Sequence, residues 1–81
     1  MKLYLISRTD SIDWNEYIEF VVAAESEENA LKWYPDGKSP NKGSWALYVQ
    51  KEVKRENIEI EHIGESNSLV EKVITYSYNN G

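Results

Sequence analysis

Short runs of β-branched and aromatic residues, placed around a single helix signal, are the feature that most constrains the fold. Residues 17–24 form such a run with no Gly or Pro inside it, which predicts a strand. Residues 58–62 alternate between apolar and polar types, which predicts a half-buried strand with Glu59 and Glu61 on one side. Similar patterns predict three further strands, at residues 3–6, 45–49 and 72–78.

One segment carries the signals of a helix. Ser26 is a residue type that caps helix N-termini, and Glu27 and Glu28 oppose the positive end of the helix dipole. Pro35 stops the helix after about two turns. An apolar stripe is then expected to face the sheet, formed by Ala30, Leu31 and Tyr34.

These segments add up to a small α+β fold, an antiparallel sheet of four to five strands with one helix packed on one face. The predicted order is strand, strand, helix, strand, strand, strand, and the turn-rich residues 35–43 are expected to form an exposed loop. Residues 1–81 are expected to form a single domain, because so short a chain cannot divide its apolar residues between two cores. Cysteine is absent, so the core must suffice without disulfides.

The charge pattern narrows the classes of partner. The net charge of −5 argues against broad binding of nucleic acids or anionic membranes. Residues 1–37 and 56–81 are acidic, whereas residues 38–55 are basic. No apolar run approaches the roughly 20 residues of a membrane span, and the N-terminus turns polar too soon for a signal peptide. A cytoplasmic location is therefore expected.

Residues with catalytic or metal-binding chemistry are few. His62 is the only histidine, and cysteine is absent, so the chain lacks the set of His and Cys ligands that a zinc site needs. His62 continues the inward phase of Ile58 and Ile60, so a packed structural role is expected. No G-x-S-x-G elbow is present, and the acidic residues 10–16 lack the spacing of a calcium loop. We therefore expect no enzyme, no cofactor and no metal, and we assign no catalytic residue.

Several stretches of the chain carry a family resemblance: Met1–Leu5, Val21–Glu28 with Ala30, Tyr34 and Pro35, Trp45, His62–Glu65 and Tyr76–Asn79. Together they resemble a family of small proteins encoded by bacteriophages and prophages. The resemblance implies a phage setting and a role like that of anti-defence factors, including anti-CRISPR proteins, and it implies no catalytic residues. The Lys-rich residues 51–55 depart from the family pattern.

The first functional hypothesis is a non-enzymatic inhibitor that binds a bacterial defence-complex protein. An acidic sheet face would dock on a basic surface of that partner, and exposed aromatic side chains would anchor it. The acidic candidates are Glu16, Glu19, Glu25, Glu59 and Glu61, and the aromatic candidates are Trp14 and Trp45.

Two alternatives stay open. The chain could sequester a nucleotide-like ligand with its basic segment and nearby tryptophans, using Lys38, Lys42, Lys51, Lys54 and Arg55. It could instead be an accessory protein that assembles with another phage protein. Pairing of two subunits through an exposed strand edge, giving a homodimer, is compatible with each of these roles.

Overall fold

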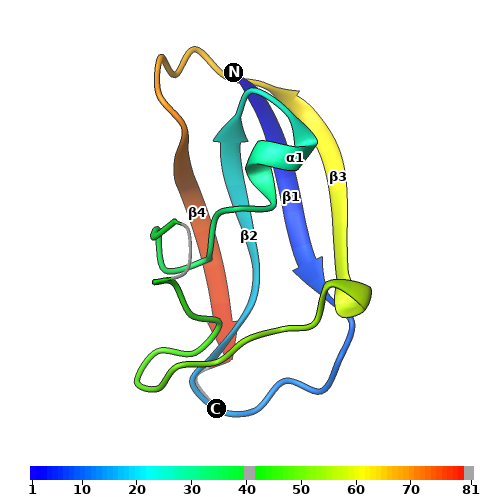
Figure 1. Ribbon diagram of the computed structural model, residues 1–81, viewed down its shortest axis with the longest axis vertical. Coiled ribbons are helices and arrows are strands. Elements are labelled where there is room, and N and C mark those ends of the chain that lie inside the picture. Colours follow the sequence, from blue (N-terminus) through cyan, green and yellow to red (C-terminus); the bar gives the residue numbers. More distant parts are fainter. Residues whose placement is uncertain (40–41, 80–81) are drawn as a thin grey trace.

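The computed structural model of the protein describes residues 1–39 and 42–79, so two residues of the predicted loop, Pro40 and Asn41, lie outside it, as do residues 80 and 81. The elements are β1 (Lys2–Arg8), β2 (Glu16–Ala24), α1 (Glu27–Ala30), a 3₁₀ turn (Arg55–Asn57), β3 (Ile58–Glu65) and β4 (Lys72–Asn79). The four strands form one antiparallel sheet in the order β3-β1-β2-β4 (Figure 1). The predicted small α+β fold is confirmed at this level.

The core lies on one face of the sheet, which we call the core face. Tyr4 and Ile6 of β1 lie beside Val22 and Phe20 of β2 in the strand register, and all four side chains are buried. Helix α1 and the chain that follows it lie over this face (Figure 1). Trp45 packs into the same cluster, so irregular chain covers much of the sheet.

Helix α1 is shorter than the sequence predicts. The predicted cap is present, because the Asn29 N–H donates to Ser26 Oγ at 3.1 Å. The helix nevertheless ends at Ala30, and the Tyr34 N–H donates to the Lys38 carbonyl at 2.9 Å instead of continuing the helical pattern. Tyr34 therefore packs against the core from irregular chain. Within residues 1–39 and 42–79, no helix is long and apolar enough to cross a membrane.

The predicted strand at residues 45–49 is wrong. A single bridge between Glu16 and Ala46 is the only sheet pairing in this stretch. The Ser44 hydroxyl accepts hydrogen bonds from the N–H groups of Ala46 at 3.0 Å and Lys51 at 2.9 Å. These local side-chain bonds offer the backbone an alternative to a strand ladder, and they fold the segment into a tight loop.

The loop at residues 35–43 is less exposed than expected. Pro35 and Gly43 are both buried, although Gly37 and Lys38 between them are exposed. Gly43 lies so close to the Tyr34 ring that a Cβ atom would overlap it. The ends of the loop are therefore part of the cover on the core face, which a one-turn helix cannot supply alone.

Candidate functional site

The side of the sheet opposite the core, which we call the outer face, carries the candidate site. Residues that lie opposite each other in an antiparallel register point to the same face, so the register defines three rows across the strands. In the strand order β3, β1, β2, β4, the first row is Glu59, Ser7, Glu19 and Ser77. The second row is Glu61, Leu5, Val21 and Thr75. The third row is Gly64, Leu3, Ala23 and Lys72. The middle of the outer face is apolar, and one end is acidic.

Three of the predicted acidic residues come together at that end. Glu59 and Glu61 are exposed and two residues apart on β3, a spacing of roughly 7 Å along the strand. Glu19 lies in the row of Glu59 with one strand between them, at roughly 10 Å. Within residues 1–39 and 42–79, none of the three takes part in an ion pair. Their negative charge is therefore free to act on a partner.

A hollow adjoins these glutamates on the β1 and β3 side of the sheet. It has a volume of about 370 Å³ and is lined by Leu5, Ser7, Glu59, Ile60 and Glu61. Lys and Arg side chains pack their alkyl stems on apolar surface and keep their charged heads at a polar rim. The hollow combines an apolar part with two carboxylates, which suits such a side chain.

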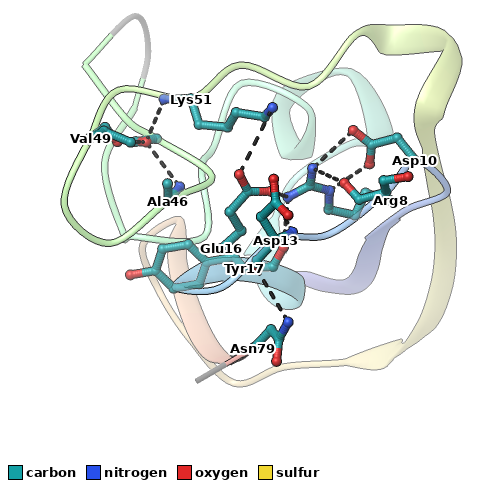
Figure 2. Close-up of polar contacts among 11 residues, drawn as sticks. Arg8, Asp10, Asp13, Glu16, Tyr17, Ala46, Val49, Lys51 and Asn79 are labelled. Carbon is teal, nitrogen blue, oxygen red and sulfur yellow. Dashed lines mark hydrogen bonds and ion pairs between the residues drawn. The ribbon is translucent and has the colours of Figure 1, made fainter. Parts of the chain in front are cut away.

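Glu16 does not belong to the outer face, contrary to expectation. Its side chain is largely buried, and Oε1 lies 3.1 Å from Arg8 Nη1 (Figure 2). The same carboxylate accepts the Asp13 N–H at 3.2 Å, and Lys51 Nζ lies 4.0 Å from its other oxygen. Burial of a carboxylate requires such partners, so Glu16 stabilises the fold and offers no charge to a ligand.

The buried Arg8 is the polar centre that sequence reasoning missed. Its guanidinium contacts both carboxylate oxygens of Asp10, at 2.6 Å and 2.9 Å, and donates to the Tyr17 carbonyl at 3.1 Å (Figure 2). The hydrogen bond with Asp10 raises the pKa of Arg8 and lowers the pKa of Asp10. The cluster ties the loop after β1 to the start of β2. No sequence signal marks it, because an arginine next to turn residues is usually exposed.

Glu25 lies away from the acidic end. It follows β2 at the end opposite Glu19, and it is exposed there. Its N–H donates to Glu71 at 3.0 Å, which joins the end of β2 to the connection before β4. The structure therefore gathers only Glu19, Glu59 and Glu61 from the five acidic candidates.

The two tryptophans differ in exposure. Trp14 is 69% exposed, as predicted, and it stands in the loop between β1 and β2, at the same end of the sheet as Glu19. The predicted exposure of Trp45 is wrong, because only 3% of this residue is accessible. Its ring packs edge-on against Phe20, with ring centroids 5.4 Å apart, and the Arg8 guanidinium lies 5.8 Å from it.

The basic residues proposed for a nucleotide-like ligand are not gathered at one site. A pocket of about 170 Å³ lies beneath the irregular chain on the core face, and Arg55 is the only one of the five that lines it. Pockets for drug-sized ligands start at about 300 Å³, so this pocket is small for a nucleotide. Lys51 lies near Glu16, and Lys38, Lys42 and Lys54 are exposed elsewhere.

His62 lies on the side of Ile58 and Ile60, as predicted, but at the exposed edge of the sheet. Its Nε2 lies 2.8 Å from Glu65 Oε2, and its ring packs on Tyr4 with centroids 5.4 Å apart. In the described part of the chain, no group of three or more His, Asp or Glu side chains is placed to hold a metal ion.

Comparisons of this chain with protein-family models, with curated proteins and with solved structures found no match. What the protein does is therefore inferred from its own surfaces. The outer face is the surface on which Glu19, Glu59 and Glu61 have no ion-pair partner in the described part of the chain.

Proposed function

We propose that the protein is a non-enzymatic binding module whose outer face docks on a basic surface of another protein. The observation that carries this proposal is the group of unpaired carboxylates of Glu19, Glu59 and Glu61 beside the apolar centre of the outer face. An apolar centre supplies area to bury, and the adjacent charges supply orientation and faster association.

The hollow supports a specific mode of contact. A Lys or Arg side chain of the partner would lay its stem against Leu5 and place its charged head between Glu59 and Glu61. Neighbouring cations of the same basic surface would then face Glu19. Trp14, exposed in the loop at this end, is placed to add an aromatic anchor at the rim.

The resemblance to phage-encoded proteins suggests the class of partner. We take it to be a protein of a bacterial defence complex, met in the bacterial cytosol, whose basic surface normally holds nucleic acid. The carboxylates would compete with phosphates for the same Lys and Arg side chains, so binding alone would inhibit the complex. No chemical step is required of the chain. Assembly with another phage protein would use the same face, and the identity of the captured partner distinguishes the two roles.

The test begins with capture from a lysate of bacteria that carry active defence systems, with and without nuclease. The retained protein is purified, and its dissociation constant is measured with wild-type chain and with the Glu59→Lys/Glu61→Lys variant. We expect the variant to bind at least about tenfold more weakly, since two close attractive contacts become repulsive. The loss should be larger at low salt, because salt screens exposed charges.

A matched control is Glu25→Lys/Glu28→Lys, which changes the net charge by the same amount away from the outer face. At a salt concentration that screens the general effect of net charge, the dissociation constant of this control should lie within about threefold of the wild-type value. Equal losses for both variants, or a partner that is retained only through nucleic acid, would contradict the proposed role of the outer face.

A further inference from the structure

A pocket lies on the core face of the sheet, separate from the outer face. The pocket of about 170 Å³ lies between the strands and the irregular chain. Its inner surface includes Ile6 and Trp45, both almost fully buried. An apolar cavity of about 150 Å³ is large enough to take up one benzene ring, so this pocket has room for one apolar side chain or ring.

The pocket also carries two opposite charges. Glu52 and Arg55 both line it, and both residues are exposed at its rim. Although Glu52 and Arg55 carry opposite charges, no ion pair joins them within residues 1–39 and 42–79. A pocket with an apolar inner surface and with one anionic and one cationic group at its mouth matches a zwitterion that bears an apolar substituent.

Both charged groups are held in place by the fold. The Tyr34 hydroxyl lies 2.9 Å and 3.1 Å from the two Glu52 oxygens, and the Gln50 side chain donates to one of them at 3.3 Å. Arg55 donates one N–H to the Ile58 carbonyl at 3.0 Å, which leaves the other guanidinium donors available. Groups fixed before binding lose less side-chain entropy when a ligand arrives.

We propose that this pocket binds a free α-amino acid with an apolar side chain, such as phenylalanine or leucine. The ammonium group of the amino acid would contact Glu52, its carboxylate would contact Arg55, and its side chain would enter the pocket toward Trp45. A residue within a peptide cannot pair with both Glu52 and Arg55, because an amide replaces its ammonium group, its carboxylate or both. The pocket is too small to enclose a ligand as large as a nucleotide.

Intrinsic tryptophan fluorescence reports on this site directly, since Trp33 and Trp45 both line the pocket. Titration of the full chain with L-phenylalanine should give a saturable change with a dissociation constant of about 0.1 to 1 mM, as expected for so small a ligand. Heteronuclear NMR shifts confined to the pocket residues would locate the binding. No response to L-phenylalanine or L-leucine up to about 10 mM by either method would overturn the proposal.

Analogues that lack one charge test the two rim contacts separately. 3-Phenylpropionate lacks the ammonium group and phenethylamine lacks the carboxylate, and each should bind at least about tenfold more weakly than phenylalanine, the loss expected for a charged hydrogen bond. Equal affinity for all three compounds would show only an apolar pocket and would overturn the zwitterion assignment.

Matched variants complete the test. Glu52→Gln keeps an acceptor for Tyr34 but removes the charge. It should therefore weaken the binding of L-phenylalanine and leave the affinity for 3-phenylpropionate unchanged. Arg55→Gln should weaken the binding of L-phenylalanine and leave the affinity for phenethylamine unchanged. The control is Lys54→Gln, at a residue next to Arg55 in sequence that does not line the pocket, and it should bind L-phenylalanine with the wild-type affinity. Loss of binding in Lys54→Gln as well would contradict the assigned contacts.

Discussion

At the scale of single residues, burial separates the charges that stabilise the fold from those that are free to bind. Arg8, with no accessible side-chain surface, is paired with both Asp10 and Glu16, so each of these carboxylates has a cationic partner within the fold. Glu59 and Glu61 have the same chemistry as Glu16 but no such partner in the described chain. The availability of a carboxylate is thus decided by its neighbours and not by its residue type.

The Arg8 cluster leads to a stability prediction. Arg8→Met should lower the free energy of unfolding by about 3 kcal/mol, because it leaves the buried carboxylate of Glu16 without its main partner. Urea unfolding followed by circular dichroism would measure this change. Arg55→Met, at an exposed arginine, should cost only about 0.5 kcal/mol.

The double variant Arg8→Met/Glu16→Gln provides the internal control. It should recover part of the lost stability, since a neutral amide carries a smaller penalty for burial than an unpaired carboxylate. If the double variant is no more stable than Arg8→Met, the loss does not come from the unpaired carboxylate of Glu16.

At the scale of elements, one carboxylate links three segments of the chain. Glu71, in the connection before β4, accepts hydrogen bonds from the Glu25 N–H at 3.0 Å, from Asn29 of α1 at 3.1 Å and from the Trp33 indole at 3.3 Å. A helix of four residues has little stability of its own. Glu71 and the Ser26 cap therefore help to fix α1 against the sheet.

These bonds make stability depend on pH in acid. The hydrogen bond from the Glu25 N–H, followed by those from Trp33 and Asn29, lowers the pKa of Glu71 below its ordinary value. A carboxyl whose folded-state pKa is lowered contributes its stability in full above the unfolded pKa of about 4.3. That contribution disappears as the pH falls through the lower folded-state pKa.

The free energy of unfolding should therefore decrease when the pH is lowered from 5 to below about 3, measured by urea unfolding at each pH. Glu71→Gln should reduce the slope of this decrease, although Asp10 retains its own contribution. Glu56→Gln, at an exposed position, should keep the wild-type slope. An unchanged slope in Glu71→Gln would show that its three bonds do not stabilise the folded state.

At the scale of the whole molecule, the sheet has one covered face and one open face, and each carries a different proposed site. The acidic end of the outer face adds to a net charge of −5, which tends to destabilise a compact chain. Binding surfaces often retain groups that cost stability. Neutralising such groups should therefore stabilise the free protein while weakening its complex.

For Glu59→Gln/Glu61→Gln, we expect a gain of about 0.3 kcal/mol at low salt, since like charges close together on a sheet repel. This corresponds to a melting temperature higher by about 1 to 2 °C for a domain of this size. Differential scanning calorimetry at about 20 mM and 500 mM salt would measure the gain and its screening. A lower melting temperature in the variant would show that these glutamates stabilise the fold.

The four strands of the sheet and the helix cap could be predicted from the sequence, because they depend on local pattern. The same reasoning wrongly predicted a strand at residues 45–49. Alternation at residues 58–62 placed Glu59 and Glu61 on one side, and Ser26 marked the start of α1, as the structure has it. The length of α1 was not predictable in this way. Pro35 marks where a helix must stop, but the chain leaves the helical pattern earlier. The N–H groups of Lys32 and Trp33 donate to carbonyls three residues back, those of Asn29 and Ala30, instead of four.

The composition and pattern of the chain by themselves determined a small α+β fold and an acidic strand, because propensity and alternation act between near neighbours in sequence. Only the tertiary structure decided that Trp45 is buried, that Glu16 is paired with Arg8, and that Glu19 joins Glu59 and Glu61. The first and the last of these depend on segments far apart in the chain, and the pairing of Arg8 with Glu16 depends on how the loop between β1 and β2 folds. A one-turn helix leaves much of the core face open, so the irregular chain after it folds over the sheet and carries Trp45 into the core.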